Sequence, residues 1–379
     1  MATQASSLFN YPEVGVPFLW PFSFFIGLEE ADLEIARDNL KFLEEVEKTQ
    51  VEKPKPAWAT ANKVEFALHT LMLRDFSRLG EKQTPTLILP PYAGHTSVIA
   101  DFYKDQSLIE ALLDNGLQTV YATEWKSANE AMKDYDIDNY LAEVNVCVDD
   151  LGKRINLIGL CQGGWLAAMY AARFPDKIAT LVLAGSPIDT GAGEGQIKDY
   201  AHTFPMSFYE ELVQMGGGLL KGEFMLEGFK NMHPDKQYFG KYAELYEHIE
   251  EPDYVHRFEQ FERWYEYTIN LPGRWYLQAI RELFKENRFA KGKFIGLGKE
   301  LHLQDVKCPV YLLAGVEDDI TPKEQVFDAE KYLGTDNKHI VKELAAGGHI
   351  GLFMGKTAIR ENWPKIARWI KAYSRHVPG

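Results

Sequence analysis

A cysteine directly follows a short apolar segment, in a setting suited to nucleophilic chemistry. Residues 155–158 have the apolar pattern of a buried strand, and residues 166–174 have the pattern of the start of a helix. Between them, Gly159-Leu160-Cys161-Gln162-Gly163 is a small-x-Cys-x-Gly sequence, the strand-to-helix turn of a nucleophile elbow with cysteine in place of serine. The sequence predicts that Cys161 attacks a carbonyl carbon and that the amide of Gln162 stabilises the oxyanion.

The alternative role for Cys161 is that of a buried structural cysteine beside a glycine-rich turn, which is the usual role of a free cysteine. The flanking strand and helix are the context that an elbow requires, and they favour the catalytic interpretation. Gly159 and Gly163 are expected to let the backbone pass close to its neighbours.

Two later loops carry the partners that a thiol nucleophile needs. In an elbow-based site the acid follows the nucleophile in the chain, and the histidine follows the acid. Residues 309–315 resemble a strand that leads into Asp318 and Asp319, and His349 lies in a glycine-rich loop after the last predicted strand. We expect His349 to deprotonate Cys161 and later to protonate the leaving group, while Asp318 fixes its tautomer. Asp319 is the alternative acid, and the sequence leaves that choice open.

A second oxyanion donor is expected after the strand predicted at residues 86–89. Pro90-Pro91-Tyr92-Ala93-Gly94-His95 closes this strand, and the amide of Tyr92 or of Ala93 is the candidate donor.

Short apolar segments alternate with helical ones around these loops. Strands are predicted at 64–74, 86–89, 118–122, 155–158, 180–185, 309–315 and 338–344, and a helix is predicted at 138–150. Parallel strands joined by helices form a doubly wound sheet. With the elbow, this order predicts an α/β class protein with an α/β-hydrolase fold and a mostly parallel sheet.

One interval interrupts the alternation. No convincing strand appears between residues 189 and 309, yet residues 200–285 hold 19 of the 49 aromatic residues. A helical subdomain with its own core is one interpretation, and a lid over Cys161 is the one we favour. We expect His95, Trp165, Trp264 and Trp275 to bind substrate, because aromatic walls suit an apolar, ester-bearing molecule.

The expected organisation has three parts: an N-terminal arm and helix (1–60), a core (61–188 and 302–379) and a helical cap (189–301). Residues 14–28 are apolar, uncharged and too short to span a bilayer. Residues 29–48 have one apolar helical stripe among acidic residues. The arm either packs on the body of the protein or docks on a partner subunit or an apolar surface.

Composition narrows the class of partner. The net charge is −14 over 379 residues and no basic block occurs, which argues against a nucleic-acid partner.

The three cysteines have no CxxC spacing, so a reducing cytoplasm is expected. No zinc-type cluster, Walker loop or GxGxxG motif occurs, and His248 and His256 are not at a usual metal-pair spacing. We therefore expect neither a metal nor a cofactor.

The residues around Cys161 resemble a known family. Gly159-Leu160-Cys161-Gln162-Gly163-Gly164 is similar to the cysteine-containing lipase-like box of polyhydroxyalkanoate synthases. Asp101, Ser107-Leu108 and the sequence Asn-Leu-Pro-Gly-Arg-Trp-Tyr at 270–276 also resemble synthase segments. The resemblance covers most of the chain from Pro85 onward and implies that Asp318 and His349 complete the site.

Other residues resemble intracellular polyhydroxybutyrate depolymerases, which similarly use a cysteine. Asp319 stands where synthases commonly carry histidine. Gly94-His95, the sequence Trp-Tyr-Glu-Tyr at 264–267 and the loop at 348–355 also resemble depolymerases. Against this, Gly163 stands where such depolymerases often carry proline.

Both relatives imply an acyl-Cys161 intermediate formed from a 3-hydroxyacyl group. We expect depolymerase-like ester cleavage, because the departures cluster in loops near the chemistry. The alternatives are a synthase that polymerises 3-hydroxyacyl-CoA and a non-catalytic binding protein on polyester granules. The resemblance implies a cytoplasmic protein that associates with polyester granules. The 14–28 arm would bind the granule surface or a second copy of the chain.

Overall fold

The structure is a computed structural model of the chain, and it describes residues 41–42, 54–80, 83–232 and 240–374. The apolar arm expected at 14–28 lies outside the described residues. So does most of the amphipathic helix expected at 29–48, of which only Lys41 and Phe42 are described, in helical conformation.

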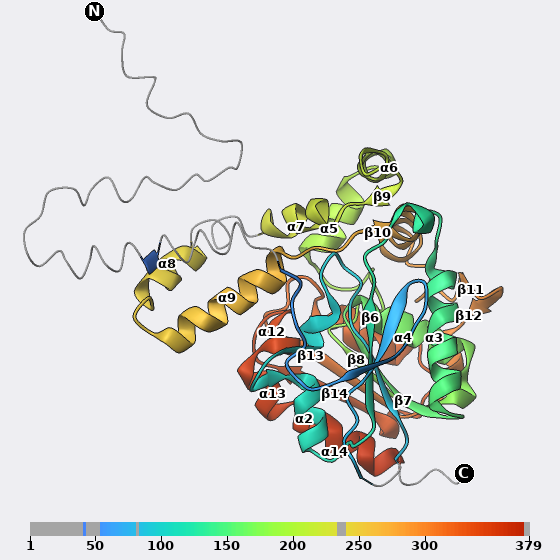
Figure 1. The fold of residues 1–379 in the computed structure, drawn as a ribbon. Helices are drawn as coiled ribbons and strands as arrows, with labels where there is room; N and C mark the ends of the chain where they lie inside the picture. Colours follow the sequence, from blue (N-terminus) through green and yellow to red (C-terminus); the bar gives the residue numbers. More distant parts are fainter. Residues whose placement is uncertain (1–40, 43–53, 81–82, 233–239, 375–379) are drawn as a thin grey trace, which may run out of the picture.

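An eight-stranded sheet forms the centre of the protein, in the order β1-β2-β6-β3-β7-β8-β13-β14 (Figure 1). Strand β2 runs antiparallel to β1 and β6, and every other neighbouring pair is parallel. This is the doubly wound, mostly parallel sheet that the sequence predicts. The strands are β1 (Lys63–Ala67), β2 (Leu71–Asp75), β3 (Thr86–Leu89), β6 (Val120–Trp125), β7 (Ile155–Leu160), β8 (Ile178–Ala184), β13 (Val310–Gly315) and β14 (Ile340–Ala345).

Helices cover both faces of this sheet. One face carries α3 (Ile137–Leu151), α4 (Gln162–Arg173) and α11 (Lys323–Phe327), and the other carries α2 (Leu108–Asp114), α12 (Gly351–Met354), α13 (Lys356–Glu361) and α14 (Trp363–Ser374). Successive strand residues point to opposite faces, so Leu157 joins the core under α4 while Ile158 joins the core under α14. Two apolar cores therefore hold β7 from both sides and fix the position of its last residue.

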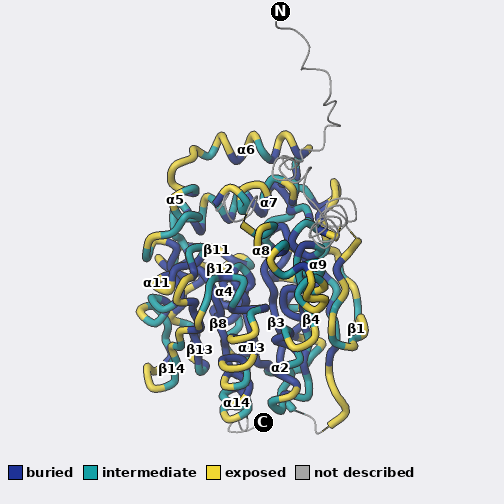
Figure 2. Tube along the Cα trace, turned by 90° about the vertical axis from the view of Figure 1, so that its left-hand side faces the viewer, coloured by how far each residue is buried: buried dark blue, intermediate teal, exposed yellow. Residues whose placement is uncertain are grey.

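The described residues of the segment 189–301 are largely helical, and Figure 2 shows α6 and α7 beyond one end of the sheet strands. Its longer helices are α5 (Gln196–Thr203), α6 (Met206–Met215), α7 (Gly222–Lys230), α8 (Lys241–Glu247), α9 (Pro252–Glu266) and α10 (Gly273–Gln278), which continues as a π-helix (Ala279–Lys285). The prediction that this interval lacks strands is wrong in detail. Strands β9 (Leu219–Leu220), β10 (Leu271–Pro272), β11 (Phe294–Gly296) and β12 (Lys299–Leu301) pair outside the main sheet.

Asp101 is a buried structural anchor. It begins β4 (Asp101–Tyr103), which pairs with β5 (Gln106–Ser107). Its carboxylate accepts hydrogen bonds from the Thr60 amide (2.8 Å), the Thr60 hydroxyl (2.7 Å) and the Ser107 hydroxyl (2.5 Å). These bonds satisfy a charge that would otherwise be costly to bury.

None of the helices in the described ranges is both long and apolar enough to cross a membrane.

Candidate active site

Cys161 stands at the tip of a strained turn between β7 and α4. Its backbone angles are φ 50 and ψ −121, which a non-glycine residue rarely adopts. An added Cβ at Gly163 would lie 2.0 Å from the Leu89 carbonyl oxygen, and one at Gly164 would lie 1.7 Å from the Ser186 hydroxyl oxygen. The elbow therefore requires glycine at both positions, and the proline common in depolymerases would not fit at Gly163.

His349 and Asp318 are joined beside this turn. The Nδ1 atom of His349 lies 2.7 Å from Oδ2 of Asp318, and both residues are buried. The other carboxylate oxygen accepts hydrogen bonds from the amides of Ile320 (3.1 Å) and Thr321 (2.8 Å). Asp318, rather than Asp319, is thus the acid that contacts the histidine. A proton held on Nδ1 leaves the lone pair of Nε2 available to the thiol.

The charge state of His349 follows from its neighbours. Burial lowers the pKa of His349, but the charges of Asp318 and Cys161 and the hydrogen bond to Asp318 outweigh burial and hold this pKa well above its usual range. The Nε2 atom is buried and makes no hydrogen bond of standard geometry. Cys161 is nevertheless close enough to contribute to the pKa shift. A histidine in this setting can take and hold the proton of the thiol.

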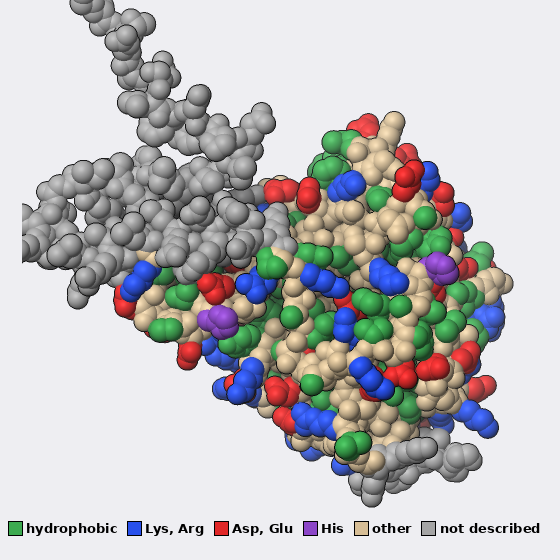
Figure 3. Space-filling model, viewed as in Figure 1, with side chains coloured by type: hydrophobic (Ala, Val, Ile, Leu, Met, Phe, Trp, Pro, Cys, Tyr) green, Lys and Arg blue, Asp and Glu red, His purple; other side chains and the backbone are tan. Residues whose placement is uncertain are grey.

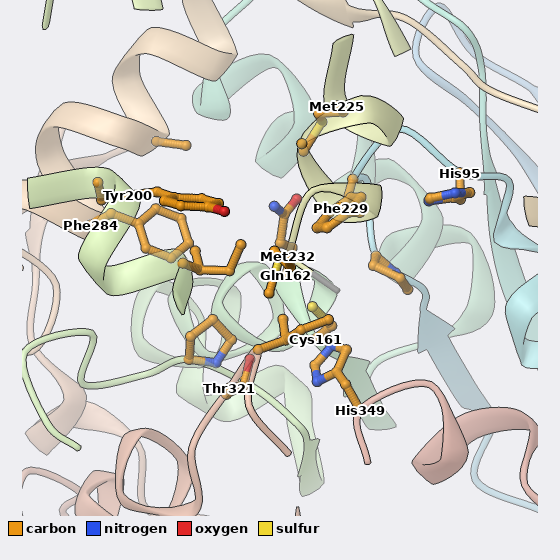
Figure 4. Close-up of a pocket in the computed structure, with 18 of the residues that line it drawn as sticks. His95, Cys161, Gln162, Tyr200, Met225, Phe229, Met232, Phe284, Thr321 and His349 are labelled. Atoms are coloured by element: carbon orange, nitrogen blue, oxygen red, sulfur yellow. The ribbon is translucent and has the colours of Figure 1, made fainter. Parts of the chain in front are cut away.

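Cys161 and His349 form part of the wall of a cavity of about 820 Å³ (Figure 4). Each is only 8% exposed. The remaining wall comes mainly from the 189–301 segment and is rich in aromatic and methionine side chains, including Tyr200, Phe208, Met225, Phe229, Trp264, Trp275 and Phe284. An apolar cavity over a buried thiol excludes water and strengthens electrostatic interactions within it.

The four residues expected to bind substrate have different places in the structure. His95, Trp264 and Trp275 line the cavity. Trp165 does not line it: its ring is buried beneath and packs on Trp275, with 5.5 Å between ring centroids. The Trp165 side chain belongs to the apolar core that also contains Tyr140 and Trp275. We therefore withdraw Trp165 as a substrate-binding residue.

The residues expected to donate to the oxyanion do not all lie at the cavity. Gln162 and Ala93 line the cavity beside Cys161, whereas Tyr92 does not. The Tyr92 ring is buried, and its hydroxyl lies 3.1 Å from the Lys126 carbonyl oxygen and 3.0 Å from that of Asn270. Of the two amides left open by the sequence, that of Ala93 is the better candidate.

His95 links the loop after β3 to the 189–301 segment. Its Nε2 atom lies 3.0 Å from the Tyr265 carbonyl oxygen, and its ring stacks on Trp264 with 4.8 Å between centroids. Beside it, the Ile269 amide donates to the Gly94 carbonyl oxygen at 2.8 Å. Burial lowers the pKa of His95 to about 4, so the ring is neutral at physiological pH. The sequence assigned His95 to substrate binding, and its role as a link was missed.

The other two cysteines have no such setting. Cys147 and Cys308 are buried and unpaired, and burial raises the pKa of each thiol to about 12. Across the described ranges, no group of three or more histidine, cysteine or acidic side chains is arranged to hold a metal ion. Cys161 is the cysteine that the structure places against a histidine.

Comparisons with known proteins place this site in context. A 27% identical relative from Haloferax mediterranei, "Poly(3-hydroxyalkanoate) polymerase subunit PhaC", aligns over 82% of this chain and 63% of its own length. Proteins of the same name from Allochromatium vinosum and Thiocystis violacea are 29% and 28% identical, over 72% and 77% of this chain and 76% and 82% of their own. The resemblance to polyhydroxyalkanoate synthases is thereby confirmed.

Solved structures confirm the fold. A monoacylglycerol lipase from Paleococcus ferrophilus matches with a TM-score of 0.50 and 18% identity, over 80% of this chain and all of its own. A structure from work on carboxylesterases of Nitrososphaera gargenis gives a TM-score of 0.50 at 15% identity, over 81% of this chain and 97% of its own. These matches, the strand order and the elbow establish an α/β-hydrolase fold.

A family model matches nearly the whole of the described body, from residue 55 to residue 379. It includes the elbow, the acid loop and the histidine loop. The chain belongs to the family described as "Protein of unknown function (DUF3141)".

Proposed function

We propose that the protein is a cysteine-dependent acyltransferase that moves 3-hydroxyacyl groups and builds polyester chains. The observation that carries this proposal is the buried Asp318–His349 pair next to Cys161, at the wall of an apolar cavity. The similarity to proteins named poly(3-hydroxyalkanoate) polymerase supports the substrate class.

The reaction begins with the Nε2 atom of His349 taking the thiol proton of Cys161. The thiolate sulfur attacks the carbonyl carbon of a 3-hydroxyacyl thioester, and the amides of Gln162 and Ala93 stabilise the oxyanion. Collapse of this intermediate breaks the bond to the leaving thiol, which receives the proton from His349. The acyl group then remains on Cys161 as a thioester.

A hydroxyl group completes the cycle. His349 deprotonates the hydroxyl of a 3-hydroxyacyl chain, the oxygen attacks the acyl-Cys161 carbonyl, and the thiolate leaves and regains its proton. The apolar lining and the burial of the thiol favour a chain hydroxyl over water as acceptor. The sequence favoured hydrolysis of polyester bonds. The similarity to proteins named polymerase and the apolar cavity favour transfer of the acyl group to a chain hydroxyl instead. Hydrolysis through the same intermediate is the second candidate, supported by the depolymerase-like loops around Asp319 and His349.

The test is to incubate purified full-length protein separately with 3-hydroxybutyryl-CoA and with amorphous polyester. We expect CoA release matched by new ester bonds, and loss of both in Cys161→Ala but not in Cys308→Ala. CoA release with free 3-hydroxybutyrate, or soluble monomer from polyester, would favour hydrolysis. Absence of every product together with polyester binding would indicate the non-catalytic granule protein instead. Granule or subunit attachment through residues 14–28 remains a separate expectation.

A further inference from the structure

We infer that the side of the cavity under α5 and α6 is a binding groove for an extended, uncharged polyester chain, which leaves the protein between Phe204, Phe208 and Met215. This inference rests on the proposed acyl transfer at Cys161 and specifies where the second reactant lies.

Cys161 lies between two apolar sides of the cavity. In Figure 4, Tyr200 and Phe284 lie on one side of the thiol, and Phe229 and His95 lie on the other. A transferase needs room on both sides of its nucleophile, because the acyl group and the attacking chain must be present together. A cavity of about 820 Å³ has the volume for both.

The side that contains His95 is closed. His95, Trp264 and Tyr265 are all buried, and the histidine ring stacks on both neighbours, at 4.8 Å and 5.2 Å between centroids. The Trp264 indole N–H donates to the Thr96 carbonyl oxygen at 3.2 Å, which fixes this wall. A closed, rigid wall limits the length of whatever binds there. It suits the short side chain of a single 3-hydroxyacyl group.

The side under α5 and α6 opens to solvent. Phe204 and Phe208 are each 36% exposed and Met215 is 72% exposed, although all three line the cavity that contains Cys161. The two phenylalanine rings stack at 4.5 Å. In Figure 3, hydrophobic side chains are visible at the end of the molecule where Figure 1 places α6. Exposed apolar side chains that continue into a catalytic cavity indicate a path for an apolar ligand.

The charge of the lining indicates which ligand this is. Among the described residues that line the cavity are Glu227 and Asp319, and neither lysine nor arginine is among them. Carboxylates at a wall disfavour a phosphate or a free acid within the cavity. A polyester chain carries methyl and methylene groups and no charge along its length, so it matches the lining. The charged part of a CoA donor would remain outside.

The test uses Phe204→Ser/Phe208→Ser, with Ile295→Ser as the matched control. Ile295 is 57% exposed on the β11–β12 hairpin and does not line the cavity. Acceptors are 3-hydroxybutyrate oligomers of increasing length, esterified at the carboxyl end so that they are uncharged. In wild type and the control, kcat/KM for transfer should rise with oligomer length. In the double variant this rise should flatten, with about a tenfold loss on the longest oligomer.

A second measurement is independent of turnover. Binding of the longest oligomer to Cys161→Ala, followed by calorimetry, should weaken by about tenfold when the two serines are added. An unchanged length dependence and unchanged binding would overturn the inference while leaving acyl transfer intact. A change in oligomeric state in the double variant would overturn the inference by assigning Phe204 and Phe208 to a contact with a second copy. Equal binding of a plain alkyl chain would overturn it by assigning them to a lipid. Failure of the proposed function would instead appear as no acylation of Cys161 in the wild type.

Discussion

Replacing Asp318 by asparagine removes the charge on which His349 depends and changes little else. The carboxylate Oδ1 holds the Ile320 and Thr321 amides, and an asparagine oxygen can accept the same two bonds. The amide group that replaces Oδ2 would face Nδ1 of His349 as a donor, which forces the proton to Nε2. The histidine then has no lone pair toward Cys161. We expect kcat to fall by about 10³- to 10⁴-fold, or about 4 to 5.5 kcal/mol of transition-state stabilisation.

The same substitution has a signature in the pH dependence of stability. The folded-state pKa of His349 is raised, because the charges of Asp318 and Cys161 outweigh burial. A raised folded-state pKa contributes stability below the unfolded value of about 6.5, and the contribution is lost as pH rises through the folded value. The difference in unfolding free energy between wild type and Asp318→Asn should therefore be larger at about pH 5.5 than at about pH 10.

The assay is CoA release from 3-hydroxybutyryl-CoA, with thermal unfolding measured on each variant. Asp319→Asn is the matched control, and it should stay within about threefold of wild type because the carboxylate bonded to Nδ1 of His349 is that of Asp318. A larger loss in Asp319→Asn than in Asp318→Asn would refute this assignment of the acid. A stability difference that grows with pH would refute the account of the histidine charge.

Two further predictions concern the cysteines and the oxyanion loop. Iodoacetamide at about pH 7.5 should label Cys161 before the other two cysteines. The thiols of Cys147 and Cys308 have a pKa of about 12, so they are almost entirely protonated at that pH. Peptide mapping that finds Cys147 or Cys308 labelled before Cys161 would contradict this prediction. His95→Phe keeps an aromatic ring but loses the hydrogen bond to the cap, so kcat should fall by about tenfold or more with KM little changed. Partial recovery in His95→Gln is expected, and a rise in KM with kcat unchanged would contradict a positioning role.

Local signals predicted the centre of the site. The elbow, the acid loop and the histidine loop each carry their own short pattern, so the sequence alone selected Cys161 and His349, which lie together in the structure, and narrowed the acid to two neighbours. The hydrogen bond between Asp318 and His349 then chose between them. That choice depends on how one loop turns, and neighbouring aspartates look alike in sequence.

Contacts between distant segments were the part that the sequence could not provide. Trp165 was assigned to the cavity because aromatic residues near a nucleophile suit a substrate wall, yet its ring lies in the core against Trp275. The link between His95 and Tyr265 joins residues 170 positions apart, so no local pattern predicts it. Strands β9 to β12 are only two or three residues long, below the length at which alternation is visible.

If Cys161 carries the acyl group, as we propose, intact-protein mass spectrometry should detect the acylated protein. The protein is mixed with one equivalent of 3-hydroxybutyryl-CoA, quenched in acid within seconds and then digested for peptide mapping. We expect one added 3-hydroxybutyryl group, on the peptide that contains Cys161, and none in Cys161→Ala. An adduct on Cys147 or Cys308, or turnover that persists in Cys161→Ala, would contradict it.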